Sequence, residues 1–225
     1  MKKNFKGSSL VEVMVIMIIV VSGVTGMYAI YGNSQKMSNN LDMKIQAIQI
    51  AREGIEAMTN IRDTNWKMLS TDNKNCWNTL NYDTNCVGNN TTTTDIKEAS
   101  YIIYQDNTDY KWKLDEITLG NELRDYKTDT YRDDYKIFTT DSNGEGFYTQ
   151  ETTADTTKFT PFTREIIVTY FDSDKLGASY NPNIATDSNG EFMKITSKVM
   201  WVDSSREQPY SVEFETFLSN WKALN

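Results

Sequence analysis

An apolar run near the N-terminus constrains this chain more than any other feature. Between Leu10 and Tyr31 the only charged residue is Glu12. A helix needs about 20 apolar residues to cross the hydrocarbon core of a bilayer, so the run is long enough to span a membrane. Residues 2–6 contain three lysines, which favour retention of this end in the cytoplasm. The sequence therefore predicts a single-pass membrane helix with the rest of the chain outside.

The short leader differs from an ordinary secretory signal, in which an apolar region of about 7–15 residues precedes the cleavage site. Here the one cleavage-like feature, Lys6-Gly7, lies before the apolar run. Cleavage after Gly7 would make Ser8 the first residue and would leave the membrane helix on the mature chain.

Glu12 needs an explanation, because a charge in a membrane helix costs about 2.5–3.5 kcal/mol at the centre of the bilayer and less near an end. One interpretation is a carboxylate that reaches the headgroup region. The other is a carboxylate that pairs with a cation. The amine that cleavage would create on Ser8 is then the obvious partner, in the same chain or in a neighbouring one.

The segment from Lys6 to Glu12 resembles the class III signal of type IV prepilins and pseudopilins. The likeness rests on the basic leader, on Gly7, on Glu12 five residues further on and on the long apolar run. It implies that a membrane peptidase cuts after Gly7. It also implies that Glu12 neutralises a neighbouring N-terminus during assembly. Family members usually begin with Phe or Met followed by Thr, whereas this chain has Ser8 and Ser9, so N-methylation of Ser8 stays open.

The resemblance implies a subunit of a type IV pilus or a related filament, most similar to a minor pilin. Such a subunit is held in the bacterial cytoplasmic membrane with its head outside and becomes part of an extracellular pilus, with roles in adhesion or secretion. Its partners would be the prepilin peptidase, other pilin subunits and the inner-membrane assembly platform. Two alternatives remain open. One is a pseudopilin of a type II secretion or DNA-uptake machine, and the other is a membrane-anchored extracellular binding protein that keeps its leader.

Beyond the apolar run the pattern becomes amphipathic. Apolar residues recur at spacings of three and four, as on one face of a helix: Met37, Leu41, Ile45, Ile48, Ala51, Ile55, Met58 and Ile61. The sequence thus predicts one helix over residues 8–63, with a transmembrane or filament-core part at 8–31 and an amphipathic spine at 32–63. The segments 51–57 and 60–66 also resemble the helix end in a group of minor pilins related to pilus modification proteins.

Residues 64–225 are predicted to form a globular, pilin-like head. Its first part, residues 64–134, is rich in Asn, Thr and Asp and is predicted to be a variable loop region that contains short strands or packed loop pieces at 101–104 and 112–114. Residues 135–222 are predicted to form an antiparallel sheet. The expected fold class is therefore α+β, with the long N-terminal helix packed on a C-terminal sheet.

The sheet prediction rests on segments rich in β-branched and aromatic residues, namely 165–171, 193–202 and 210–218. In the second of these, apolar residues such as Ile195 and Val199 alternate with polar ones such as Lys194 and Lys198. This alternation is typical of a strand with one face buried.

Cys76 and Cys86 are the only cysteines, and both lie in the part expected outside the membrane. An oxidising compartment favours a disulfide between them, and two free thiols are the alternative.

Several function classes are not supported by the composition. The net charge of −8 argues against a broad nucleic-acid-binding surface. The chain has no His, and it has no glycine-rich phosphate loop or nucleophile motif, so we expect no enzymatic activity. Carboxylates such as Asp133 and Asp134 in polar loops indicate a solvated surface.

No resident cofactor is expected, although calcium is an alternative at one loop. Asp141, Asn143 and Glu145 alternate as in the first half of an EF-hand loop, but the twelfth position is Thr152 instead of Glu. The Asn-Gly dipeptide in this loop is equally consistent with a β-turn.

Overall fold

The computed structural model describes residues 8–88, 95–106, 108–117, 130–139, 148–151, 159–171, 192–202 and 209–220. Its helices are α1 (Ser8–Met68), α2 (Asn73–Cys76) and the 3-10 turns η1 (Ser70–Asp72), η2 (Leu80–Tyr82), η3 (Thr84–Cys86) and η5 (Thr130–Tyr135). Its strands are β1 (Ser100–Gln105), β2 (Trp112–Glu116), β3 (Lys136–Thr139), β4 (Tyr148–Thr149), β5 (Phe159–Phe171), β6 (Phe192–Trp201) and β7 (Tyr210–Ser219). The chain divides into two compact units, Met1–Ile45 and Gln46–Asn225, which are described separately.

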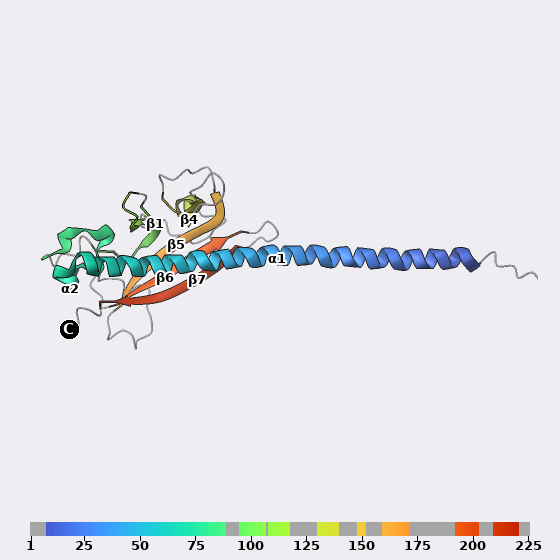
Figure 1. Cartoon of the computed structure of the whole chain (residues 1–225), viewed down its shortest axis with the longest axis horizontal. Helices are drawn as coiled ribbons and strands as arrows, with labels where there is room; N and C mark the ends of the chain where they lie inside the picture. The colour runs from blue at the N-terminus through green and yellow to red at the C-terminus, as the bar shows by residue number, and fades with distance from the viewer. Residues whose placement is uncertain are drawn as a thin grey trace, which may run out of the picture. The chain divides into compact units, whose positions relative to one another are not determined.

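The second unit is built around β5, the longest strand that the structure describes. One edge of β5 pairs with β6 over ten residues, and β6 pairs in turn with β7. Along its other edge, β5 pairs with β1 at Ile166 and with β3 at Thr163. The strands β2 and β4 extend the sheet from β1 and β3, and all of these pairings are antiparallel. Figure 1 shows the second half of α1 running across this sheet. The predicted α+β class is therefore confirmed.

The alternation expected for the last two strands is present. On β6, Ile195 and Val199 are buried, whereas Lys194 and Lys198 are half-buried on the opposite face. The face of α1 that packs on the sheet consists largely of small residues at its start, and the buried positions are Ala47, Ile50, Ala51, Gly54, Ala57, Met58, Ile61, Asn65 and Trp66.

The predicted buried stripe of α1 was partly wrong. Met37, Leu41 and Ile45 are 65%, 50% and 53% exposed, and burial begins at Ala47. The buried face of α1 is also rotated about the helix axis, by part of a turn, from the predicted apolar face. Small residues allow the helix backbone to approach the sheet closely, and a pattern read from large apolar residues does not detect them.

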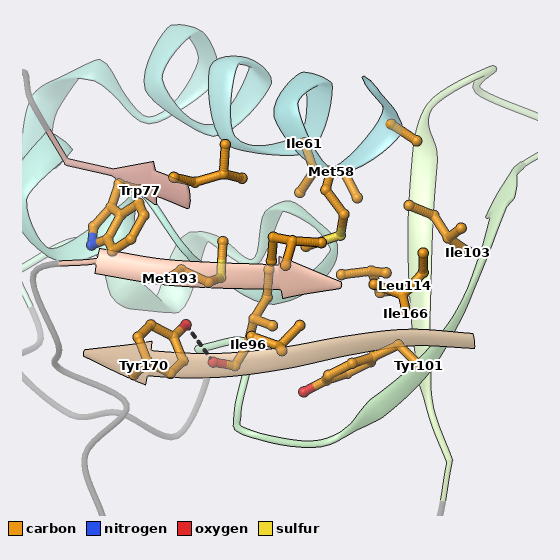
Figure 2. Close-up of a cluster of buried hydrophobic side chains, with 14 of the residues drawn as sticks. Met58, Ile61, Trp77, Ile96, Tyr101, Ile103, Leu114, Ile166, Tyr170 and Met193 are labelled. Carbon is orange, nitrogen blue, oxygen red and sulfur yellow. Dashed lines mark hydrogen bonds between the residues drawn. The ribbon is translucent and has the colours of Figure 1, made fainter. Parts of the chain in front are cut away.

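The main core lies between α1, the sheet and the segment that follows the helix. Figure 2 shows Met58 and Ile61 directed from α1 towards the strands that carry Met193 and Ile166. Trp77 and Ile96 belong to the same core, and they come from the polar region after the helix. Burial of such large side chains contributes about 1.5–3 kcal/mol each. Part of the predicted variable region is thus core.

The boundaries also differ from the predicted ones. The helix α1 ends at Met68, five residues beyond the predicted end at residue 63. The strands β1 and β2 belong to the sheet although they lie before residue 135. In β1 the side chains of Tyr101, Ile102 and Ile103 are all buried, so both faces of this strand are covered. The short strands or packed loop pieces predicted at 101–104 and 112–114 are thus strands, and they belong to the sheet instead of to a loop region.

At Gly54 the backbone of α1 lies close to the sheet. A Cβ atom at this position would lie 2.6 Å from Ser197 Oγ and 2.9 Å from Ile166 Cδ1. We expect Gly54→Ala to lower the free energy of unfolding by about 2 kcal/mol, because overpacking outweighs the better helix propensity of alanine. Thermal unfolding of the full chain in detergent micelles, followed by near-ultraviolet circular dichroism, measures this change.

Two control variants make the Gly54 prediction specific. At Gly32, also in α1, a Cβ would meet nothing within 4 Å, so Gly32→Ala should leave the unfolding of the head unchanged. The Ser197 hydroxyl is buried and has no hydrogen-bond partner among the described residues. Ser197→Ala should therefore be tolerated alone and should recover part of the stability lost in Gly54→Ala. Strictly additive effects of the two changes would contradict the predicted contact.

Candidate functional site

The first unit presents an apolar helix surface. From Leu10 to Tyr31 every residue of α1 is exposed, and the large side chains Ile18 and Tyr28 are 68% and 74% exposed. The helix is long and apolar enough to cross a membrane. Soluble proteins rarely leave a continuous apolar surface of this extent in water. The surface is therefore compatible with a membrane anchor.

Glu12 is the single charged residue on this surface. It lies in the second turn of α1, and its side chain is exposed. Ser8 and Glu12 are four residues apart in α1, so both positions lie along one side of the helix.

Two hydroxyl groups within the apolar segment bond to the backbone of the helix. Ser22 Oγ donates to the carbonyl of Ile19 at 2.9 Å, and Thr25 Oγ1 donates to the carbonyl of Ser22 at 2.9 Å. In an apolar environment an unpaired hydroxyl is costly, so these bonds suit the segment to hydrocarbon surroundings.

Some predicted site residues lie outside the described part of the chain. Gly7 is one of them, and the structure places Ser8 at the start of α1 without describing its side chain. The candidate calcium ligands Asp141, Asn143 and Glu145 also lie outside the described residues. Within the described residues, no group of three or more Cys, Asp or Glu side chains could hold a metal ion.

The structure confirms the predicted disulfide. Cys76 and Cys86 are joined, with their Cα atoms 5.4 Å apart, and both are 1% exposed. With Leu69 they form a small apolar cluster at the end of α1. The bond closes a loop that begins at the last residue of α2 and contains η2 and η3.

Asp72 links the segments on either side of this loop through hydrogen bonds. Its carboxylate accepts hydrogen bonds from the backbone nitrogen of Gly88 at 3.0 Å and from the side chain of Asn75 at 2.9 Å. These bonds hold the pKa of Asp72 below its ordinary value, and the bond from Gly88 has the largest effect. Asp72 also caps the first turn of α2. The disulfide and this carboxylate together tie both ends of the loop.

Asp95 joins this loop to the sheet. Its backbone bridges to Thr79, and its side chain is 8% exposed. Nearby, the hydroxyl of Tyr170 donates to the carbonyl of Ile96 at 2.7 Å (Figure 2) and accepts a bond from Asn78 Nδ2 at 3.0 Å. Burial raises the pKa of Asp95 to about 6 and moves the pKa of Tyr170 well above its usual range.

The raised pKa predicts how stability changes with pH. Between about pH 4 and pH 6 the unfolded chain releases the Asp95 proton while the folded chain keeps it, so stability falls as the pH rises through this window. We expect Asp95→Asn to raise the free energy of unfolding by about 1 kcal/mol at neutral pH and to have little effect near the unfolded pKa. The expected gain is less than the full shift because the side chain is not completely buried. Thermal unfolding of the full chain at both pH values tests this.

A matched control separates the burial of Asp95 from the general effect of removing a charge. Asp134 is exposed, so Asp134→Asn should change the free energy of unfolding by less than about 0.5 kcal/mol at either pH. Equal gains for the two variants would contradict the assignment to Asp95.

A buried polar cluster that we did not predict surrounds Arg164, which is 0% exposed. Its guanidinium donates to Gln150 Oε1 at 2.9 Å, to Glu53 Oε1 at 3.0 Å and to the carbonyl of Ile103 at 2.7 Å. A longer bond of 3.4 Å reaches the carbonyl of Ile50 in α1. Burial lowers the pKa of Arg164, and the negative charge of Glu53 opposes that shift.

This cluster connects the helix, β1, β5 and the segment after β4. Gln150 adds two bonds of its own, from Nε2 to the carbonyls of Tyr135 and Arg164 at 3.0 and 2.7 Å. The only signal in the sequence was a pair of charged residues, Arg164 and Glu165, inside an otherwise apolar strand. The cluster accounts for the relative position of these elements and offers no reactive group to a substrate.

The described residues thus combine an exposed apolar helix with one carboxylate and a disulfide-bonded α+β head. A comparison of the chain with protein-family models, with curated proteins and with solved structures finds no match.

Proposed function

We propose that this chain is a subunit of a type IV pilus or a related filament, most like a minor pilin. The observation that carries the proposal is the exposed apolar helix whose one carboxylate, Glu12, lies four residues after Ser8. The basic leader and Gly7 immediately before it complete the pattern of a prepilin signal. A membrane helix that served only as an anchor would have no need of a carboxylate at this position.

In this proposal the helix has two environments. Before assembly, the segment 8–31 crosses the bacterial cytoplasmic membrane with the leader inside and the head outside. After the prepilin peptidase cuts behind Gly7, the helix leaves the lipid and packs among the helices of other subunits on the assembly platform. Packing of apolar side chains favours the filament, and pairing of Glu12 with an N-terminal amine sets the register.

The head supports a location outside the cytoplasm. The buried disulfide between Cys76 and Cys86 is typical of proteins exposed to an oxidising compartment. The polar loops and the α+β architecture suit a domain displayed on a filament surface. No described group supports an enzymatic role, and we propose none.

The test uses the cells from which the protein comes. Gly7→Leu should block cleavage, so the chain should retain residues 1–7, stay in the cytoplasmic membrane and be missing from the sheared extracellular fraction. The unchanged chain should lack the leader and appear in both fractions. Gly32→Ala, which changes a glycine with free space around it, serves as the control and should behave like the unchanged chain.

The possible results distinguish the alternatives. A processed chain that stays in the cell envelope and is needed for secretion or DNA uptake would indicate a pseudopilin, which shares the same motifs. An unprocessed chain in the membrane, unaffected by Gly7→Leu, would contradict the proposal and would leave an anchored extracellular binding protein.

A further inference from the structure

The two outer edges of the sheet differ. At β2 the outer backbone is occupied: Asn81 Nδ2 donates to the Leu114 carbonyl at 2.9 Å, and the Leu114 nitrogen donates to Asn81 Oδ1 at 2.9 Å. The hydroxyl of Tyr82 also donates to the carbonyl of Trp112 at 2.7 Å. At the opposite end, β7 pairs with β6 alone among the described strands (Figure 1). A strand edge that has no neighbour within the described part of the chain is a candidate template for another strand.

On the face of β7 that is turned towards the core, several apolar side chains are only half-buried. Tyr210 stacks on Trp201 with ring centroids 5.4 Å apart, and Trp201 in turn contacts Phe162 at 6.1 Å. This row therefore crosses the three strands β5, β6 and β7. Val212 and Phe214, on the same side of β7, are only half-buried. Apolar side chains on an added strand would cover them.

The other side of β7 carries a row of charges. Lys198 lies 3.6 Å from Glu213, and Lys194 lies 2.6 Å from Glu215. Both contacts use Oε1, and the two glutamate side chains are 49% and 50% exposed, whereas the lysines are about 20% exposed. The positive residues on β6 are thus followed by negative residues on β7. A cationic strand would continue the alternation.

We propose that β7 is a docking edge for an extended segment of a partner protein, with lysine or arginine on one face and apolar side chains on the other. The main chain of the segment would extend the sheet, and its cations would pair with Glu213 and Glu215. Pairing of β7 with β7 of a second copy is disfavoured, because it would bring these carboxylates opposite one another. The inference goes beyond the proposed filament function and does not depend on it.

The probe is a synthetic peptide of about nine residues that alternates lysine with valine, matching the usual length of a strand. The full chain in detergent micelles is titrated, and binding is followed by fluorescence anisotropy and by hydrogen exchange of the β7 amides. Bound peptide should slow exchange in β7 about tenfold or more. The same peptide with alternate backbone nitrogens methylated keeps its charge but cannot form the backbone hydrogen bonds of a sheet. Its affinity should be lower by about tenfold or more.

The variant Glu213→Lys with Glu215→Lys reverses the charge of the edge and should transfer preference to a peptide that alternates glutamate with valine. Its circular dichroism and melting temperature show whether the head is folded. If the double change does not fold, Glu213→Gln alone should still weaken binding of the lysine peptide.

Three results would overturn the proposal. Equal binding of the methylated peptide would indicate attraction to the acidic chain in general. Protection, in the free chain, of the β7 amides that point away from β6 would show that the edge is already covered. Self-association through β7, seen by sedimentation and removed by the double change, would replace a partner segment with a second copy.

Discussion

Arg164→Met should lower the free energy of unfolding of the head by about 3–5 kcal/mol, the largest effect expected for any single change in the core. The variant removes the donor to Gln150, Glu53 and two backbone carbonyls at once. These acceptors lie at the junction of α1 with the sheet, where water cannot readily replace the guanidinium. The full chain in detergent micelles, unfolded with guanidinium chloride and followed by near-ultraviolet circular dichroism, measures the change.

The chain offers a matched control on the solvent side of the sheet. Lys198→Met also removes one cation from an ion pair, but its partner Glu213 is half exposed. This change should alter the free energy of unfolding by no more than about 0.5 kcal/mol. Arg164→Lys keeps the positive charge but not the planar guanidinium group. Its loss of unfolding free energy should lie between those of Arg164→Met and Lys198→Met. Equal losses for the two methionine variants would show that the Arg164 cluster contributes nothing beyond an ordinary surface pair.

Glu12→Ala should reduce the amount of the chain in filaments about 100-fold or more while leaving its head folded. In the proposed assembly, the carboxylate neutralises an amine that has been moved from water into the packed helices. An unpaired buried charge costs about 3–5 kcal/mol, and each 1.4 kcal/mol is about a factor of ten in an equilibrium constant. The ratio of sheared extracellular protein to membrane protein, measured by immunoblotting of the native cells, gives the effect.

Two further variants at this position separate charge from shape. Glu12→Gln keeps the length of the side chain but removes its charge, so it should fail as Glu12→Ala does. Glu12→Asp keeps the charge and should retain part of the assembly. Formation of the Cys76–Cys86 bond reports in each case that the head is intact. Normal filament incorporation of Glu12→Gln would contradict a charge-pairing role.

The sequence predicted the periodic elements well, for physical reasons. A membrane-length apolar run, a three-to-four spacing in α1 and the alternation along most of β6 each follow from the geometry of one helix or one strand. The disulfide followed from the number of cysteines and the expected compartment. Both kinds of inference need only local sequence.

The features that the sequence did not reveal depend on contacts between distant elements. The buried face of α1 is offset from the predicted one because Gly54 and its small neighbours allow close approach to Ser197 on β6. A short strand was predicted at 101–104, but its place in the sheet was not, because β1 pairs with β5 about 65 residues further along the chain. Arg164 was not singled out, since its partners lie as far as 114 residues away in the sequence.

The same distinction applies to the candidate site. The spacing of Gly7, Ser8 and Glu12 is a local pattern, so the sequence contains it completely. The position of β7 at the end of the described sheet could not have been predicted, because it depends on which strand pairs with which.

The most direct test of the central claim is the mass and N-terminal sequence of the intact protein isolated from its native membrane. The account predicts a chain that begins at Ser8, with or without one added methyl group, and that retains the whole of α1. A chain that still begins at Met1, in cells with an active prepilin peptidase, would contradict it.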